Sequence, residues 1–172
     1  MRYKERLRKS TEPRGELASR TLAMPADSNP KGDIFGGWIM ALMDSAGKMS
    51  ATPYAGGRVV TVSVSNITFL QPVHVGDTVC CYTEVKRVGR TSITLDVEVW
   101  VLRQGQGERV RVTEAEFTFV AIDEDGRPRE LIRAAVEARR PAAPEPRRAD
   151  GQKRARLTTA GANIWGAAKL RA

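Results

Sequence analysis

Apolar and polar residues alternate along several parts of this chain. Val60, Val62 and Val64, for example, are separated by Thr61 and Ser63, so the three valines are expected on one face of a strand. Short runs rich in Gly, Asp and Pro separate the alternating segments, which favours hairpins and an antiparallel sheet. Four such segments are found: residues 59–64, 78–85, 94–102 and 114–122.

One segment follows a helical period instead. Residues 35–50 are rich in Ala, Met, Leu and Ile, and Ile39, Met43 and Ala46 recur at i, i+4 and i+7. Residues 27–33, which precede this segment, are loop-forming and can lead into a helix start. The chain is therefore predicted to run strand, loop, one long helix and then four or five antiparallel strands, an α+β arrangement.

The predicted sheet is too large for its single helix, which can cover only one face. The opposite face would still carry apolar residues such as Tyr82, Trp100 and Val120. The edges of the sheet would also need protection from unwanted strand pairing. We therefore expect the working unit to be an oligomer.

Composition narrows the class of protein further. The 172 residues are 41% hydrophobic, enough for one core, and no apolar run is long enough to span a membrane. The basic N-terminus lacks the apolar segment of a secretory signal, so a cytoplasmic protein is expected. Cys80 and Cys81 are adjacent, which excludes a disulfide framework. His74 is the only histidine, so no multi-histidine metal site is expected within one chain.

The formal net charge of +8 is unevenly distributed. Residues 1–15 carry six basic and two acidic residues, residues 139–172 carry nine and two, and residues 16–138 have a net charge of −3. We therefore expect a basic N-terminal extension, a folded domain over 16–138, and a basic tail whose Pro, Ala and Arg content predicts disorder. The acidic domain argues against a folded nucleic-acid-binding surface.

The predicted helix start offers chemistry that needs no histidine. Gly36 and Gly37 leave the first helical N–H groups open to an approaching oxyanion. Asp44 follows Gly37 by seven residues and so lies on nearly the same helix face. Spacing alone favours a different interpretation, in which Asp44 pairs with Lys48, the glycines pack against the sheet, and Asn29 bonds its own loop.

The other reactive side chains are expected to have ordinary roles. His74 precedes a turn and is expected to be an exposed loop residue, and any Ser-His-Asp or Cys-His triad would have to use it. Cys80 and Cys81 have no cationic neighbour within two residues, so they are expected to be simple strand residues.

A resemblance to a known family favours the catalytic interpretation of the helix start over the purely structural one. The run from Asn29 to Asp44 (Asn-Pro-Lys-Gly-Asp-Ile-Phe-Gly-Gly-Trp-Ile-Met-Ala-Leu-Met-Asp) resembles the active-site segment of hotdog-fold acyl-CoA thioesterases of the YciA type. The resemblance implies one long central helix wrapped by a five- to six-stranded antiparallel sheet, paired into dimers and commonly assembled as hexamers. It extends over about residues 16–130. Further similar stretches are residues 22–25, 57–62, 69–73, 75–82, 86–93 and 112–121.

The resemblance also implies roles for individual residues. Asp44 would be the catalytic carboxylate, and Asn29 would meet it from a neighbouring subunit. A backbone N–H near Gly37 would polarise the thioester carbonyl. The expected reaction is hydrolysis of acyl-CoA to a free acid and CoA, with Asp44 either activating water or attacking directly. No cofactor is expected, because CoA is part of the substrate and product.

The phosphates of CoA require a basic site, and one hairpin offers candidates. Residues expected to bind CoA are Arg58, Lys86, Arg87, Arg90, Thr91 and Ser92. A solvated hairpin tip is an equally good interpretation of this charge. Ser65 stands where many relatives have an acidic residue, which puts fine specificity in doubt.

Two other functions remain open from the sequence. The same fold could serve as a non-catalytic acyl-CoA-binding regulator, although such a protein would not need Asp44 and Asn29. The basic tail over 139–172 could bind RNA or a membrane surface, whereas neither nucleic acid nor membrane is expected as a partner of the domain itself.

Overall fold

The computed structural model of the 172-residue chain describes residues 12–103, 107 and 109–131. The predicted tail lies outside the described residues, as does most of the predicted N-terminal extension. The elements in chain order are β1 (Glu16–Leu22), a short 3₁₀ helix η1 (Pro25–Asp27), α2 (Gly36–Ala55), β2 (Val59–Phe69), β3 (Thr78–Val88), β4 (Ser92–Leu102) and β5 (Arg109–Ala121).

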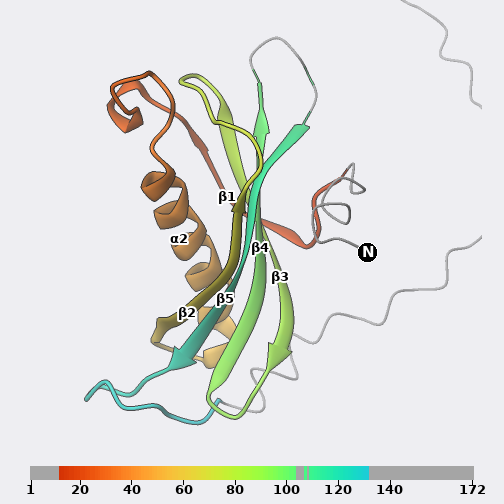
Figure 1. Ribbon diagram of the computed structural model, residues 1–172. Coiled ribbons are helices and arrows are strands. Elements are labelled where there is room, and N and C mark those ends of the chain that lie inside the picture. Colours follow the sequence, from red (N-terminus) through yellow and green to blue (C-terminus); the bar gives the residue numbers. More distant parts are fainter. Residues whose placement is uncertain (1–11, 104–106, 108, 132–172) are drawn as a thin grey trace, which may run out of the picture. The chain divides into compact units, whose positions relative to one another are not determined.

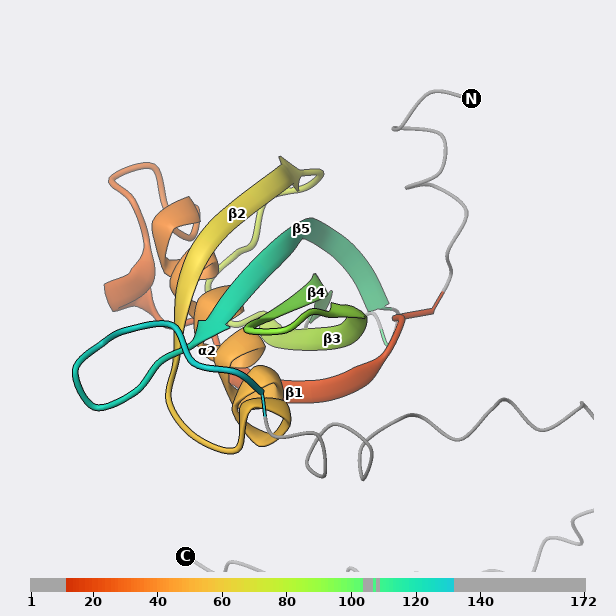
Figure 2. The same cartoon turned by 90° about the horizontal axis from the view of Figure 1, so that it is seen from below.

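The five strands form one antiparallel sheet in the order β1-β3-β4-β5-β2. Helix α2 lies along one face of this sheet (Figure 1). The sheet curves around the helix, so that α2 contacts all five strands (Figure 2). The predicted α+β architecture, one long helix wrapped by an antiparallel sheet, is confirmed.

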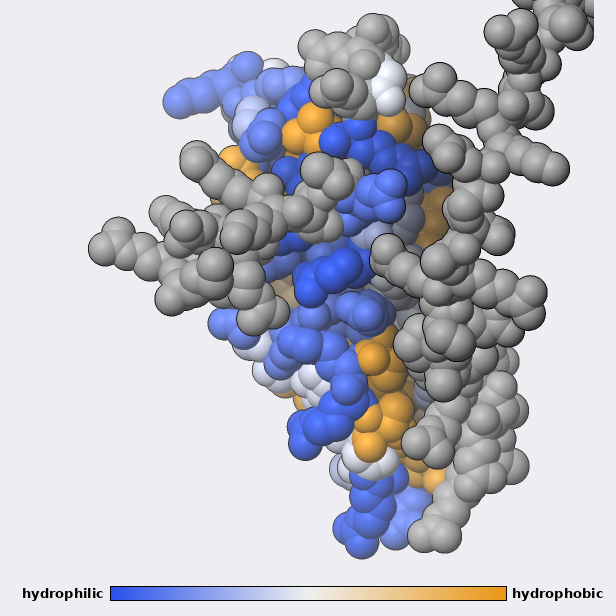
Figure 3. All heavy atoms as spheres, turned by 90° about the vertical axis from the view of Figure 1, so that its right-hand side faces the viewer, coloured by the Kyte–Doolittle hydropathy of each residue, from blue (hydrophilic) through white to orange (hydrophobic). Residues whose placement is uncertain are grey.

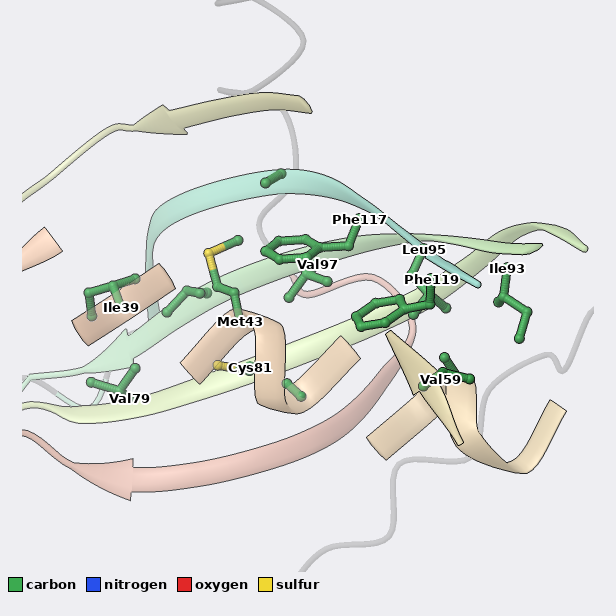
Figure 4. Close-up of a cluster of buried hydrophobic side chains, with 14 of the residues drawn as sticks. Ile39, Met43, Val59, Val79, Cys81, Ile93, Leu95, Val97, Phe117 and Phe119 are labelled. Atoms are coloured by element: carbon green, nitrogen blue, oxygen red, sulfur yellow. The ribbon is translucent and has the colours of Figure 1, made fainter. Parts of the chain in front are cut away.

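The core fills the space between α2 and the sheet (Figure 4). From the helix come Ile39 and Met43, and from β5 come Phe117 and Phe119, whose ring centroids lie 6.2 Å apart. The alternation predicted for β4 holds, because its odd-numbered apolar residues all face the helix and are fully buried. Those residues are Ile93, Leu95, Val97, Val99 and Val101.

Helix α2 continues past the predicted end near Ser50 because its apolar face continues. Ala51 and Ala55 are fully buried, and Pro53 is tolerated in the last turn. The helix ends where Gly56 adopts a left-handed conformation (φ 63°) and donates its N–H to the Thr52 carbonyl.

Gly47 allows α2 to approach the sheet closely. A Cβ atom at this position would lie 2.8 Å from two ring atoms of Phe119. From the sequence, close packing against the sheet was considered only for the glycines at the helix start, and Gly47 was not among them. At Gly36, in contrast, a Cβ would meet the Phe69 ring at an ordinary 3.5 Å.

We expect Gly47→Ala to lower the free energy of unfolding by about 1–2 kcal/mol, because overpacking against Phe119 outweighs the better helix propensity of alanine. Urea unfolding at a fixed protein concentration measures the change. Gly36→Ala is the matched control and should be within about 0.5 kcal/mol of wild type. A more stable Gly47→Ala variant would contradict this account of the packing.

Strand β2 departs from the simple alternation that the sequence suggested. Its pairing with β5 shifts register between Thr61 and Ser63, and again between Ser65 and Thr68. Residues directly opposite in an antiparallel pair share a face. Val60 pairs with Val120 on the outer face, whereas Val64 pairs with Phe117 on the helix face. The prediction that the three valines share one face was therefore wrong, because β-bulges interrupt the strand.

The outer face of the sheet, opposite α2, is mainly hydrophilic where the described side chains are visible (Figure 3). Glu98 is only 1% exposed and accepts hydrogen bonds from Arg14 Nε (2.5 Å), Arg111 (3.3 Å) and Trp100 Nε1 (2.9 Å). Arg111 also contacts Glu114 at 2.5 Å. This buried group of charges is called the outer-face network below.

The outer-face network changes the argument for an oligomer. Tyr82 and Trp100, two of the three apolar residues expected to need a cover, are already buried in the single chain together with Cys80, whereas Val120 is partly buried. The exposed apolar side chains lie mainly elsewhere, and several belong to the edge strand β2, where Val62 is 55% and Phe69 51% exposed. The described part of the chain contains no helix long and apolar enough to cross a membrane.

Candidate active site

Asn29 lies in a tight loop between η1 and α2. Its side-chain oxygen accepts hydrogen bonds from the N–H groups of Lys31 (2.9 Å) and Asp33 (3.2 Å). Its own N–H donates to the Asp33 carbonyl at 2.7 Å, and its carbonyl accepts from Gly32 N–H at 2.9 Å. Asn29 therefore is the turn residue that its sequence context suggested. With Oδ1 occupied, the amide NH₂ is left as the group that can donate to a ligand.

The start of α2 presents backbone donors for which the described part of the chain supplies no acceptor. The first helical hydrogen bonds are donated by Trp38 and Ile39 to the Phe35 carbonyl, at 3.0 and 3.4 Å. The N–H groups of Gly36 and Gly37 precede these bonds and carry the partial positive charge of the helix terminus. The Phe35 ring, 61% exposed, lies so close to Gly37 that an added Cβ would overlap it.

Asp44 is partly buried, between the apolar Met43 and the exposed Ser45. Its Oδ1 accepts a hydrogen bond from the Thr61 hydroxyl of β2. The salt bridges of the described residues include none to Asp44, so the alternative pairing with Lys48 is not found. Among the described residues, the Asp44 carboxylate is therefore held by a neutral hydroxyl and not by an ion pair.

The predicted shared face of Gly37 and Asp44 does not make them neighbours. Seven residues of helix separate them by about 10 Å along the axis. A reacting carbonyl has to lie about 3 Å from both its oxyanion donor and its base. One chain therefore cannot use both groups on the same thioester.

A pocket of about 280 Å³ opens beside the helix start. Its walls are mostly apolar and come from three separate segments of the sequence, which is why sequence spacing did not reveal it. The lining residues are Ile34, Gly36, Ile39, Phe69, Leu70, Gln71, Pro72, Val73, Val112 and Thr113.

The candidate CoA-binding residues lie at the other end of the helix. Backbone hydrogen bonds join Arg58 to Ile122 (3.0 Å) and Thr91 to Ala121 (2.9 Å), which brings the β2 start beside the β3–β4 hairpin. This end lies opposite the start of α2 (Figure 1). Arg90 is exposed and lies 3.5 Å from Glu130. Arg87 is exposed and Ser92 partly buried on the same hairpin.

Lys86 is engaged differently from the other basic candidates. Its ammonium lies 3.0 Å from Glu116 and 3.1 Å from Asp96. The hydrogen bond to Glu116, followed by that to Asp96, raises the pKa of Lys86 above its usual value. In the single chain its charge is thus already balanced.

The remaining reactive side chains support no second catalytic centre in the described ranges. Burial raises the pKa of the Cys81 thiol to about 11, so it stays protonated and unreactive near neutral pH. His74 is half-exposed, as expected for a loop residue, and lies 3.6 Å from Asp33. Within residues 12–103, 107 and 109–131, no three His, Cys, Asp or Glu side chains are grouped to hold a metal ion.

Known proteins share this architecture and sequence. Residues 31–108 match the thioesterase superfamily. The acyl-CoA thioester hydrolase YciA of Salmonella typhimurium is 55% identical over 122 residues, covering 69% of this chain and 92% of its own. A hexameric thioesterase from Yersinia pestis is 56% identical with a TM-score of 0.66, covering 70% of this chain and 98% of its own. A hexameric hotdog fold thioesterase of Campylobacter jejuni is 39% identical with a TM-score of 0.68, covering 72% of this chain and 96% of its own. The chain therefore belongs to the hotdog-fold acyl-CoA thioesterases of the YciA type.

Proposed function

We propose that this chain hydrolyses acyl-CoA thioesters to a free carboxylic acid and CoA, with Asp44 activating the attacking water. The observation that carries the proposal is the environment of the Asp44 side chain. It is a partly buried carboxylate on a mainly apolar helix, without a cation partner among the described residues and held by one hydroxyl. Such a group can accept a proton, which is the task of a general base.

The reaction follows from the groups available. Asp44 takes a proton from water as the water oxygen bonds to the thioester carbon. The carbonyl oxygen becomes an oxyanion, which the Gly37 N–H at the helix start stabilises. Collapse of the tetrahedral intermediate breaks the carbon–sulfur bond, and the proton on Asp44 passes to the departing CoA sulfur. Direct attack by Asp44 is the competing route and would form an anhydride.

We propose that the site is completed by a second copy of the chain. The distance between Gly37 and Asp44 in one protomer requires donors and base from different protomers. The Asn29 loop of one subunit then meets the Asp44 helix of another, and its NH₂ group adds a donor. Solved relatives described as hexameric support an assembly of this kind, which we propose to be a trimer of such dimers.

Related proteins have been studied at the same residue types. A hexameric broad specificity acyl-coenzyme A thioesterase, 50% identical to this chain, was solved as an aspartate-to-alanine mutant. An acyl-CoA hydrolase of Staphylococcus aureus was solved as an asparagine-to-alanine mutant with CoA and as an aspartate-to-alanine mutant. These choices support assigning the chemistry to an aspartate and an asparagine.

We propose that Arg58, Arg87 and Arg90, with the hydroxyls of Thr91 and Ser92, bind the phosphates of CoA. Guanidinium groups pair strongly with phosphate oxygens. Because these residues lie at the C-terminal end of α2, they would serve a site built with a neighbouring subunit. Lys86 would first have to leave Asp96 and Glu116, so it is the weakest of the six candidates.

Asn29→Asp separates the two roles of Asn29. Aspartate keeps the oxygen that accepts from Lys31 and Asp33 and so preserves the turn, but it replaces the NH₂ donor by negative charge. We expect kcat for acyl-CoA hydrolysis to fall by about a hundredfold or more. Thiol release from an acyl-CoA panel measures the rate. Wild-type kcat in a folded Asn29→Asp variant would exclude the donor role.

A further inference from the structure

Thr61 makes the contact between the edge strand and the candidate base. Strand β2 runs beside α2 in both ribbon views (Figures 1 and 2), and the Thr61 hydroxyl donates a hydrogen bond to Asp44 Oδ1. Thr61 pairs with Phe119, a core residue, so its side chain lies on the helix-facing side of the sheet. The contact joins residues 17 positions apart in sequence.

We propose that Thr61 is a positioning residue for hydrolysis, which holds the Asp44 carboxylate so that its second oxygen faces the attacking water. This inference rests on the proposed role of Asp44 as the base. A threonine hydroxyl has one proton to donate, and here that proton goes to Oδ1. Oδ2 is then the oxygen left to accept a proton from water.

The orientation of the carboxylate matters because an aspartate can rotate about two side-chain bonds. A hydrogen bond from a β-branched residue restricts that rotation, because threonine itself has few accessible χ1 rotamers. The hydroxyl of Ser45, the next residue in sequence, donates instead to the Ala41 carbonyl at 2.9 Å. Among the described side chains, Thr61 is the one recorded as holding Asp44.

The shape of β2 places Thr61 at this position. The register shift directly after Thr61 makes it the last residue before the bulge, and the preceding residues alternate regularly against β5. Val60, one residue earlier, pairs with Val120 on the outer face. The bulge begins only after Thr61, so it does not change the side of the sheet on which the Thr61 hydroxyl lies, which is the side that faces the helix.

Isosteric substitution tests the proposal. Thr61→Val removes the hydroxyl with little change of shape, and we expect kcat to fall by about tenfold with KM within about twofold of wild type. Thr61→Ser restores a donor and should recover most of kcat. Thr94→Val is the matched control, because it removes a threonine hydroxyl pair with Thr118 (3.2 Å) on the outer face of the sheet. This control should leave kcat unchanged.

Two further results separate this inference from the proposed function. Asp44→Asn is measured in the same assay, and Thr61→Val should add no further loss in the Asp44→Asn background. Wild-type kcat in Thr61→Val beside an inactive Asp44→Asn would overturn the role of Thr61 alone. Failure of Thr61→Ser to restore kcat would do the same. If Thr61→Val does not fold, the comparison of Thr61→Ala with Thr61→Ser replaces it. An active Asp44→Asn would overturn the proposed function itself.

Discussion

Asp44→Asn is expected to lower kcat for acyl-CoA hydrolysis by a factor between about 10² and 10⁴, the usual contribution of a general base. The amide keeps the size of the side chain and can still accept from Thr61, but it cannot take a proton from water. KM should stay within a few-fold of wild type, because the substrate contacts are unchanged. Thiol release over a panel of acyl-CoAs, at saturating substrate, measures the loss.

Lys48→Ala is the control for this prediction. If Asp44 were only a surface carboxylate, the two substitutions would have similarly small effects. We expect Lys48→Ala to hydrolyse at the wild-type rate. Binding of acyl-CoA to Asp44→Asn, with the thioester recovered intact, would show that the variant is folded. Equal turnover by wild type and Asp44→Asn would refute the role of Asp44, and intact acyl-CoA recovered from wild type as well would favour a non-catalytic regulator.

Glu98→Ala is expected to lower the free energy of unfolding by about 3–5 kcal/mol, the cost of breaking a buried ion pair by removing the carboxylate that faces Arg111. The substitution removes the acceptor of Arg111 and Trp100 Nε1 within the outer-face network. Arg111 Nε has no hydrogen-bond partner among the described residues, so after the substitution the buried guanidinium would be compensated by Glu114 alone. Urea unfolding at one protein concentration measures the effect.

The matched control is Glu130→Ala. Glu130 also pairs with an arginine, Arg90, but their side chains are 71% and 82% exposed, so the expected change is below about 1 kcal/mol. The contrast between Glu98 and Glu130 tests burial as the cause, since both variants lose one carboxylate. A loss for Glu98→Ala no larger than for Glu130→Ala would show that the outer-face network contributes little.

Periodicity in the sequence was enough to predict the main elements, because each has one face in a continuous core. Residues 35–50 have a helical period and β4 has a period of two. In the structure the first segment lies in helix α2 and the second is a strand, and the apolar residues of both pack in the core. The predicted helix end near Ser50 was too early, because Ala51 and Ala55 still pack on the sheet and Pro53 is tolerated in the last turn. The glycine that ends the helix follows directly at position 56.

The candidate site was predicted less completely, since it depends on contacts between distant segments. Asn29 and Asp44 were identified by resemblance, and spacing alone had favoured a pair between Asp44 and Lys48. The contact from Thr61 could not be predicted, because the bulges of β2 decide which of its residues face the helix. The outer-face network was missed for a similar reason, since Arg14 meets Glu98 across 84 residues of sequence.

The position of Thr61 within the regular part of β2 limits which mutations of the gene this strand can accept. Surface loops commonly tolerate insertions and deletions, but the side chains of a strand alternate between two faces. One residue inserted between Val59 and Val60 would turn the hydroxyl to the outer face and direct the side chain of Val60 at Asp44. This stretch of the coding sequence should therefore accept point substitutions more readily than any change of length.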